Sequence, residues 1–179
     1  MLDRKQAVLV VIDIQGKLAT LMYQKEILFA NVIRMIHAAR VLEIPIIWTE
    51  QLPDKLGETA PQIKEALQGV DVVVKKHFSC WPNEDFREEL KKLGRTQVLV
   101  TGIETHICVY RTVMDLLTAN YNVQLVTDAV SSRIEHNYHL AVEKMKDAGA
   151  VLTSVEMALF EMFHVAEGDQ FREIIKIVK

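Results

Sequence analysis

Residues 96–117 read TQVLVTGIETHICVYRTVMDLL, and this stretch decides the fold because it predicts a strand, a turn and a helix in succession. The run VLV at 98–100 is branched and apolar, which is typical of a strand covered on both faces of a parallel sheet. We expect Gly102 to end that strand. From Val109 onward, apolar residues recur every three or four positions, the period of a helix with one buried face.

Cys108 lies in the first turn of this predicted helix. We expect Thr105 to be the N-cap, which puts Cys108 at the third helical position. There the free backbone N–H groups and the helix dipole favour a thiolate. A strand-to-helix turn is also where open α/β sheets place their ligands. The alternative is a buried structural cysteine, and the rest of the chain bears on that choice.

Composition bounds the class of protein. The 179 residues are half apolar and one quarter charged, which predicts one soluble domain over residues 1–179. A net charge of −3 gives no electrostatic reason to expect nucleic acid or a membrane surface as partner. The N-terminus enters a strand without a signal-peptide pattern. Two cysteines are too few for a disulfide framework, so we expect a reducing, cytoplasmic setting.

Strands and helices alternate along the whole chain. We expect the other strands at 7–13, 44–51, 71–76, 122–128 and 150–153. Helices are expected at 26–42, 60–67, 83–93 and 131–149, the last of these capped by serines, with two more helical segments at the C-terminus. This alternation predicts a three-layer α/β/α, Rossmann-like domain with a six-stranded parallel sheet. The polar loop QLPDKLGET is expected at the surface near the site.

Three reactive side chains follow three of these strands. Asp13 ends the first strand, Lys75 ends the third, and Cys108 follows the fourth. The carboxyl ends of parallel strands open on one edge of the sheet, so the three side chains can meet in one cleft. Cys108 would be a nucleophile, Asp13 its general acid and base, and Lys75 a charge stabiliser. Each residue alone reads more simply as a loop acid, a solvated lysine or a core thiol.

The segments VIDIQ, VVKKHFSCW, GIETHICVYRT and VTDAVSSR together resemble the isochorismatase-like hydrolases, the cysteine hydrolase superfamily that includes nicotinamidase. The resemblance runs from about residue 6 to about residue 160 and looks closest to the isochorismatase domain-containing proteins. It implies that Asp13, Lys75 and Cys108 are the catalytic triad of the family. Lys75 matches better than Lys76, because the family lysine stands three residues before the aromatic of a K-x-x-aromatic-S pattern.

The resemblance also implies further parts of the site. The Ile103–Glu104 bond matches a non-proline cis peptide of the family. The backbone N–H groups of Glu104 and Cys108 match the oxyanion hole. The expected substrate-binding residues are Gln15, Leu18, Trp81, His106 and Tyr110.

Two differences from the family limit the reactions that we expect of this protein. Nicotinamidases bind a metal through an aspartate and two histidines in the loop after the second strand, and TEQLPDKLGET has no histidine. We therefore expect no metal and no cofactor. True isochorismatases have glycine where this chain has Cys108. A cysteine there favours hydrolysis of a C–N bond, of the amide type, in a small molecule through a thioester.

Other readings stay open. A catalytically retired domain, used as a scaffold or binding protein, is the main alternative. A thiol-redox protein is less favoured, because Cys80 and Cys108 lack C-x-x-C spacing. A dyad of His106 with Cys108 is also disfavoured, since helical neighbours two apart point to different sides. Cys80 either lines the cleft or packs in the core. Asp128 and the residues at 131–133 predict a capped loop at the sheet edge. A dimer or tetramer is expected from the resemblance.

Overall fold

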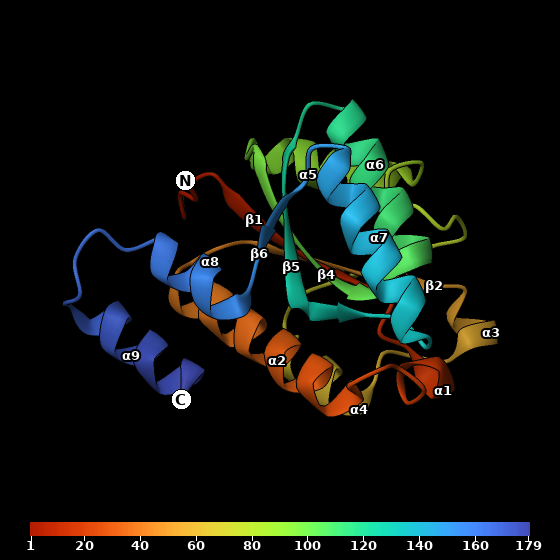
Figure 1. The fold of residues 1–179 in the computed structure, drawn as a ribbon, viewed down its shortest axis with the longest axis horizontal. Coiled ribbons are helices and arrows are strands. Elements are labelled where there is room, and N and C mark those ends of the chain that lie inside the picture. Colours follow the sequence, from red (N-terminus) through yellow and green to blue (C-terminus); the bar gives the residue numbers. More distant parts are fainter.

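The computed structural model describes residues 1–179 and is built on one six-stranded sheet (Figure 1). Its strand order is β3-β2-β1-β4-β5-β6, and every pairing is parallel. The strands are β1 (Ala7–Ile12), β2 (Ile46–Gln51), β3 (Val72–Lys75), β4 (Gln97–Ile103), β5 (Asn122–Ser131) and β6 (Val151–Thr153). The predicted six-stranded parallel sheet is therefore confirmed.

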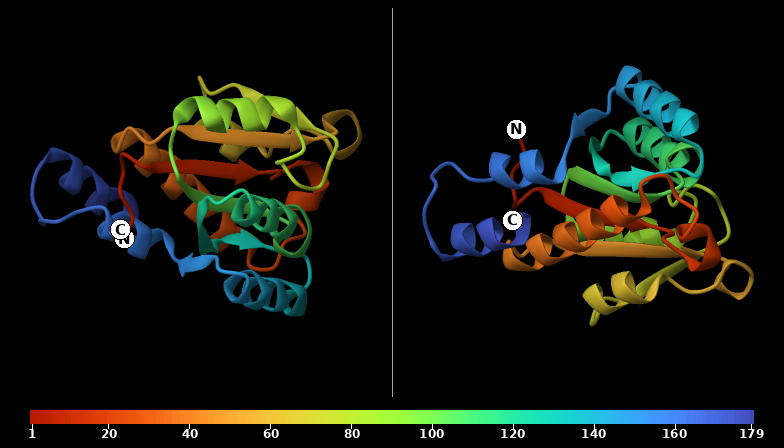
Figure 2. Two further views of the ribbon diagram at one scale, coloured as in Figure 1. Left: turned by 90° about the horizontal axis from the view of Figure 1, so that it is seen from above. Right: turned by 60° about the horizontal axis from the view of Figure 1, so that its bottom comes forward.

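Helices cover both faces of the sheet (Figure 2). One layer contains α2 (Lys25–Val41), α4 (Pro61–Ala66), α8 (Val155–Glu161) and α9 (Asp169–Val178). The other contains α5 (Glu84–Leu93), α6 (Tyr110–Thr118) and α7 (Glu135–Asp147). Two short helices, α1 (Gly16–Ala19) and α3 (Pro53–Leu56), lie in loops after β1 and β2. None of the helices has the length and apolar character needed to cross a bilayer.

The central position of β1 in the sheet explains why its sequence is continuously apolar. Every one of its residues is buried. Val8 and Val10 pack into the core beneath α5, α6 and α7, whereas Leu9 and Val11 pack into the core beneath α2 and α4. Side chains of a strand alternate between its faces, so a strand covered on both sides needs apolar residues at every position.

The strand β4 is longer than predicted. It passes through Gly102 and ends at Ile103, with a register shift between Val100 and Gly102. Gly102 has φ +119°, and a Cβ there would lie 2.1 Å from the carbonyl oxygen of Ile12. Glycine is thus required by the close approach of β1 and β4 and does not terminate the strand.

The prediction for the segment after β5 was wrong in two respects. Asp128 lies inside β5, which continues to Ser131, and its carboxylate accepts a hydrogen bond of 2.9 Å from the backbone N–H of Val155 at the start of α8. The N-cap of α7 is Ile134 and not a serine. Ser131 instead donates its hydroxyl to the carbonyl of Tyr23 at 2.6 Å. The serines join β5 to the loop before α2 and do not cap a helix.

The order of the strands defines where a site can form. From β1 the chain proceeds to β2 and β3 on one side, and from β4 it proceeds to β5 and β6 on the other. Loops after β1 and β4 therefore diverge and leave a crevice at the carboxyl edge of the sheet, the place where ligands bind in open α/β folds.

Candidate active site

Asp13 is the first residue after β1, and its backbone is held in the left-handed region with φ 50°. Few residues other than glycine adopt this conformation, and those that do are concentrated at functional sites. The carboxylate accepts a hydrogen bond of 2.7 Å from the hydroxyl of Thr49 through Oδ1. Its Oδ2 atom lies 2.5 Å from Nζ of Lys75. Burial raises the pKa of Asp13, against the opposing effects of Lys75 and Thr49.

Lys75 is the last residue of β3, and its side chain has no solvent exposure. Besides Asp13, its ammonium donates to the carbonyls of His77 at 3.0 Å and Phe78 at 3.1 Å. Burial is the largest single effect and disfavours the charge, but Asp13 and the sulfur atoms of Cys80 and Cys108 together outweigh it, so the pKa of Lys75 is held above its ordinary value. Lys76 is exposed. The structure therefore brings Lys75, and not Lys76, to Asp13.

Cys108 is buried in a single π-helical turn, Thr105–Val109, that leads directly into α6. Its Sγ donates to Oε1 of Gln51 at 3.4 Å. Burial raises the pKa of the Cys108 thiol far above its ordinary value, and the Asp13 charge raises it further. The expectation that the helix start favours a thiolate was wrong, because desolvation and a neighbouring carboxylate outweigh the helix dipole. Both effects favour the protonated thiol of Cys108 over the thiolate.

The start of the π-helical turn also differs from the prediction. Its N-cap is Glu104, with extended backbone, and Thr105 is the first residue inside the turn. The Thr105 hydroxyl is buried and has no hydrogen-bond partner. The carbonyl of Glu104 accepts from the N–H groups of both Ile107 and Val109, at 3.0 and 3.2 Å. The Ile103–Glu104 peptide bond is cis. Cys108 is thus the fourth residue of a widened turn.

A cavity of about 180 Å³ lies at this edge of the sheet. It is lined by Asp13, Gln15, Leu18, Gln51, Leu56, Phe78, Ile103, Glu104, Ile107 and Cys108. Asp13 and Cys108 therefore border the same cavity. Lys75 is not in the lining but binds the Asp13 carboxylate. Of the expected substrate-binding residues, Gln15 and Leu18 are in this lining.

Gln15 borders the cavity, but its amide is already engaged. Its Nε2 donates to the carbonyls of Gln51 at 3.1 Å and Gly57 at 2.7 Å, and its Oε1 accepts from the N–H of Gln51 at 2.7 Å. Both hydrogens and one acceptor site are thus used by the main chain. Gln15 fixes the end of β2 to the following loop and has little capacity left for a ligand.

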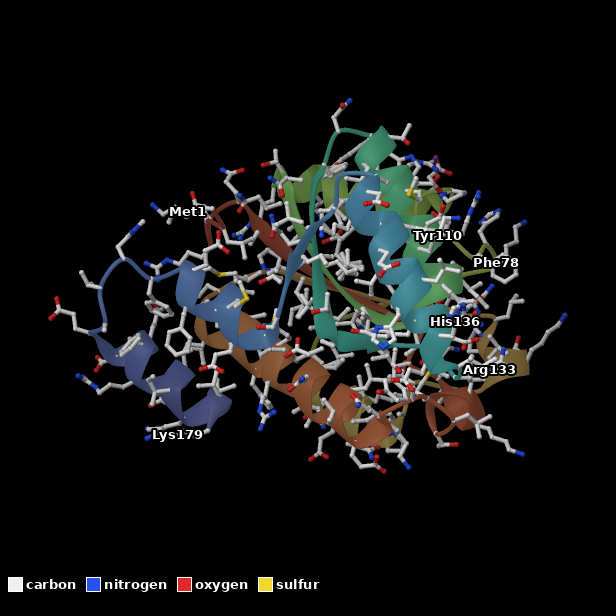
Figure 3. All side chains as sticks on the ribbon, viewed as in Figure 1. Met1, Phe78, Tyr110, Arg133, His136 and Lys179 are labelled. Atoms are coloured by element: carbon white, nitrogen blue, oxygen red, sulfur yellow. The ribbon has the colours of Figure 1, made fainter.

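The other three expected lining residues lie elsewhere. Trp81 packs edge-on against Tyr121, with ring centroids 5.8 Å apart. His106 and Tyr110 line a separate depression of about 190 Å³ against α7. Nδ1 of His106 is 2.9 Å from the hydroxyl of Ser132 and has no contact with the Cys108 thiol. His106, in the widened turn, and Tyr110, at the start of α6, thus border a different depression from the one that Cys108 lines. Figure 3 shows Tyr110 on the side of the molecule that carries α7.

Several cavity residues were not predicted. Gln51 ends β2, so its place at the carboxyl edge was a signal that could have found it. Leu56 ends the short helix α3 and Phe78 is in the loop after β3; they are 38% and 59% exposed, and no periodicity marks them. Phe78 projects from the surface in Figure 3. The structure adds these three residues to the site.

Glu104 contributes a second buried charge beside the cavity. Its carboxylate accepts from the backbone N–H of Arg133 at 2.9 Å and from Nε of the same residue at 3.2 Å. Arg133 itself is half exposed and lies at the surface in Figure 3. The charge of Glu104 is therefore compensated on the side facing Arg133. No group of three or more His, Cys, Asp or Glu side chains is placed to hold a metal ion.

Comparison with known proteins identifies the family. Residues 7–157 match the Isochorismatase domain. Isc1, a secreted isochorismatase effector of Phytophthora sojae (strain P6497), is 36% identical over 177 residues, which are 97% of this chain and 84% of that protein. Isochorismatase domain-containing protein 2A of Mus musculus is 40% identical over 149 residues, 82% of this chain and 69% of that protein.

Two solved structures have the same architecture. The MAR1 ribonuclease of Caenorhabditis elegans superimposes with a TM-score of 0.92 at 36% identity, covering 99% of this chain and 91% of that one. YcaC of Pseudomonas aeruginosa, solved with hexane-2,5-diol and covalent acrylamide, has a TM-score of 0.92 at 26% identity, covering 98% and 90%. The architecture of this chain is therefore that of the isochorismatase-like hydrolases. The chain belongs to the isochorismatase domain family.

Proposed function

We propose that this protein is a cysteine hydrolase that cleaves the C–N bond of a small amide through a thioester on Cys108. One observation carries the proposal. The carboxylate of Asp13 borders the same cavity as the Cys108 thiol, and it is bound from its other side by the buried ammonium of Lys75. A scaffold protein has no need of an ion pair buried behind a thiol, because burying charges costs several kcal/mol per ion before pairing.

The first half of the reaction forms the thioester. Cys108 attacks the carbonyl carbon of the amide as Asp13 takes the thiol proton. The raised pKa of Asp13 suits this transfer, since a group that acts first as a general base and then as a general acid works best when its pKa approaches the operating pH. The protonated Asp13 then gives its proton to the departing nitrogen, and the C–N bond breaks. An amine or ammonia leaves.

The second half restores the enzyme. Asp13 takes a proton from water, the water oxygen attacks the thioester carbon, and the C–S bond breaks. The proton returns to the Cys108 sulfur, and a carboxylic acid is released. The proposed backbone N–H groups of Glu104 and Cys108 would stabilise the oxyanion in both halves. Lys75 stays protonated throughout and balances the charge that moves between Asp13 and Cys108.

The protonated resting thiol is consistent with this scheme. A free thiolate would form only at alkaline pH, because burial and the Asp13 charge raise the pKa of Cys108. Nucleophilic attack at neutral pH then requires Asp13 to accept the proton as the bond forms, the activation used in other base-assisted nucleophiles. The covalent acrylamide in the relative YcaC is compatible with reactive thiol chemistry in this family.

The site lacks features that would favour the ribonuclease activity named for the relative from C. elegans. The cavity lining contains no arginine, lysine or histidine to bind a phosphate, and the net charge of −3 gives no attraction to RNA. A small molecule as substrate, no cofactor, and a homo-oligomer as the functional unit belong to the same proposal.

The proposal is tested by trapping the acyl-enzyme. The protein is mixed with a panel of small amides, quenched in acid and measured by intact-protein mass spectrometry, with hydroxylamine added in parallel to capture acyl groups as hydroxamates. We expect an acyl adduct on Cys108 that is absent in Cys108→Ala and retained in Cys80→Ala. Product release without any adduct or hydroxamate would contradict the thioester. No turnover of any amide, together with an inert Cys108, would favour the scaffold alternative.

A further inference from the structure

The walls of the cavity beside Cys108 are mostly apolar. Leu18, Leu56, Phe78, Ile103 and Ile107 line it, and Gln51 is the neutral polar side chain that contacts the thiol. Apolar walls with a few placed polar groups are typical of small-molecule sites. An acyl chain would contact the apolar walls, and the amide end would lie toward Gln51, Asp13 and Cys108.

Both charged side chains in the cavity lining, Asp13 and Glu104, are already compensated. Asp13 is paired with Lys75, whose three ammonium hydrogens go to Asp13 and to two backbone carbonyls. The carboxylate of Glu104 is bound by Arg133. No arginine, lysine or histidine is in the lining. A substrate carboxylate would thus find no cation, and burying an unpaired charge is strongly unfavourable.

The size of the cavity sets a second limit. About 180 Å³ is room for about six water-sized groups at the volume of liquid water. That is the size of an amide with an acyl chain of about four carbons. The mouth is formed by Leu56 and Phe78, both partly exposed, so the entrance is apolar as well.

We propose that the cavity selects uncharged, short-chain aliphatic amides and excludes analogues that carry a carboxylate. That these amides are substrates rests on the proposed hydrolase function. The charge selectivity of the cavity, in contrast, can be measured without turnover. Cys108 itself reports it, because any reagent that alkylates this thiol must first enter the cavity.

The first experiment compares iodoacetamide with iodoacetate, which share a reacting carbon and differ in charge. Rates at Cys108 are measured by peptide mass spectrometry at one neutral pH and divided by the rates for glutathione. We expect the preference for iodoacetamide to exceed that of glutathione by about tenfold or more, because the anion must be buried without a partner. A ratio equal to that of glutathione, or a preference for iodoacetate, would overturn the proposal.

A charged variant gives a matched control. Leu56→Arg brings a cation to the mouth and should shift the preference toward iodoacetate by about tenfold, whereas Leu52→Arg should leave it unchanged. Leu52 is the N-cap of α3 and Leu56 is its last residue, and they are 37% and 38% exposed, but only Leu56 is in the lining. Equal effects of the two substitutions would contradict selection by the cavity walls.

The second experiment uses hydrolysis of butyramide and of succinamate, which adds a carboxylate to a similar chain. We expect release of ammonia from butyramide at a kcat/KM at least about tenfold higher. Equal hydrolysis of both would support the hydrolase and overturn the selectivity. Hydrolysis of neither, with the alkylation preference intact, would count against the hydrolase and leave the selectivity supported.

Discussion

Nζ of Lys75 lies 2.5 Å from Oδ2 of Asp13, and the two side chains are 0% and 6% exposed. The two charges are therefore interdependent, because each compensates the other where little of either side chain is exposed. Removing one partner of such a pair leaves the remaining charge buried and alone, which costs more than the pair contributes.

Lys75→Met should destabilise the fold by about 3–5 kcal/mol at neutral pH, since it isolates the Asp13 carboxylate. Lys76→Met, at the exposed neighbouring position, should change stability by no more than about 0.5 kcal/mol. The double variant Asp13→Asn/Lys75→Met should recover much of the loss. Urea unfolding measures all three. Equal stabilities for Lys75→Met and Lys76→Met would show that the pair is not buried in solution.

Thr105→Val should maintain or increase stability, by up to about 1 kcal/mol, because it removes a buried hydroxyl that has no partner. Thermal unfolding compares this variant with the wild type. If Thr105 were an N-cap, as the sequence suggests, the same change would cost about 1 kcal/mol. A loss of that size would therefore contradict the π-helical turn. Asn83→Ala is the control, because Asn83 caps α5 through the N–H of Phe86 and should show the full loss.

Cys80 should make the fold sensitive to alkaline pH. Its thiol is fully buried, and burial raises its pKa from 9.0 to about 11. The unfolded chain therefore loses the thiol proton first as the pH rises from 9 to 11, and stability falls over that range by on the order of 2 kcal/mol. Cys80→Ala should be less stable at pH 7 but should lose less stability between pH 9 and 11. Parallel pH profiles for the two proteins would refute this.

Thr49→Val should move the acidic limb of kcat/KM for amide hydrolysis to higher pH. The base form of Asp13 is needed, so activity falls as the pH drops through its pKa, which burial raises. The Thr49 hydroxyl donates to Asp13 and stabilises its charged form, so its removal raises that pKa further. Thr118→Val, at an exposed position on α6, should leave the profile unchanged. A limb that moves to lower pH would contradict Asp13 as the base.

The sequence is sufficient to predict the sheet and the meeting of Asp13, Lys75 and Cys108. Continuous apolar strands such as Ala7–Ile12 fix which residues end each strand, and parallel pairing brings those ends to one edge. The choice of Lys75 over Lys76 as the partner of Asp13 also follows from the sequence, since the resemblance selects Lys75. The sheet and the meeting of the strand ends depend only on the period of a strand and on the topology of the sheet, whereas the choice of Lys75 depends on the resemblance.

The remaining parts of the site depend on three-dimensional packing. Leu56 enters the cavity from the end of the short helix α3 and Phe78 from a loop, and no periodicity reveals the path of either segment. The raised pKa of Cys108 follows from burial and from Asp13, neither of which is visible in the nearby sequence. The prediction that Gly102 ends the strand is wrong because the need for glycine comes from a close approach to Ile12, which is distant in the chain and not visible in the local sequence.

The most direct test of the central claim is the rate at which iodoacetamide labels Cys108 in wild type and Asp13→Asn, from mildly acidic to alkaline pH. Two effects of Asp13 oppose each other. As a charge it raises the pKa of the thiol, and as a base it removes the proton. Asp54→Asn, an exposed acid on α3, is the control.

The account predicts that Asp13→Asn labels several-fold more slowly than wild type at neutral pH, because proton transfer to Asp13 is lost. The labelling rate of the variant should rise with pH as the thiolate forms, whereas the wild-type rate should stay nearly constant around neutrality. Labelling of Asp13→Asn that equals or exceeds the wild-type rate at neutral pH would contradict base activation of Cys108 by Asp13.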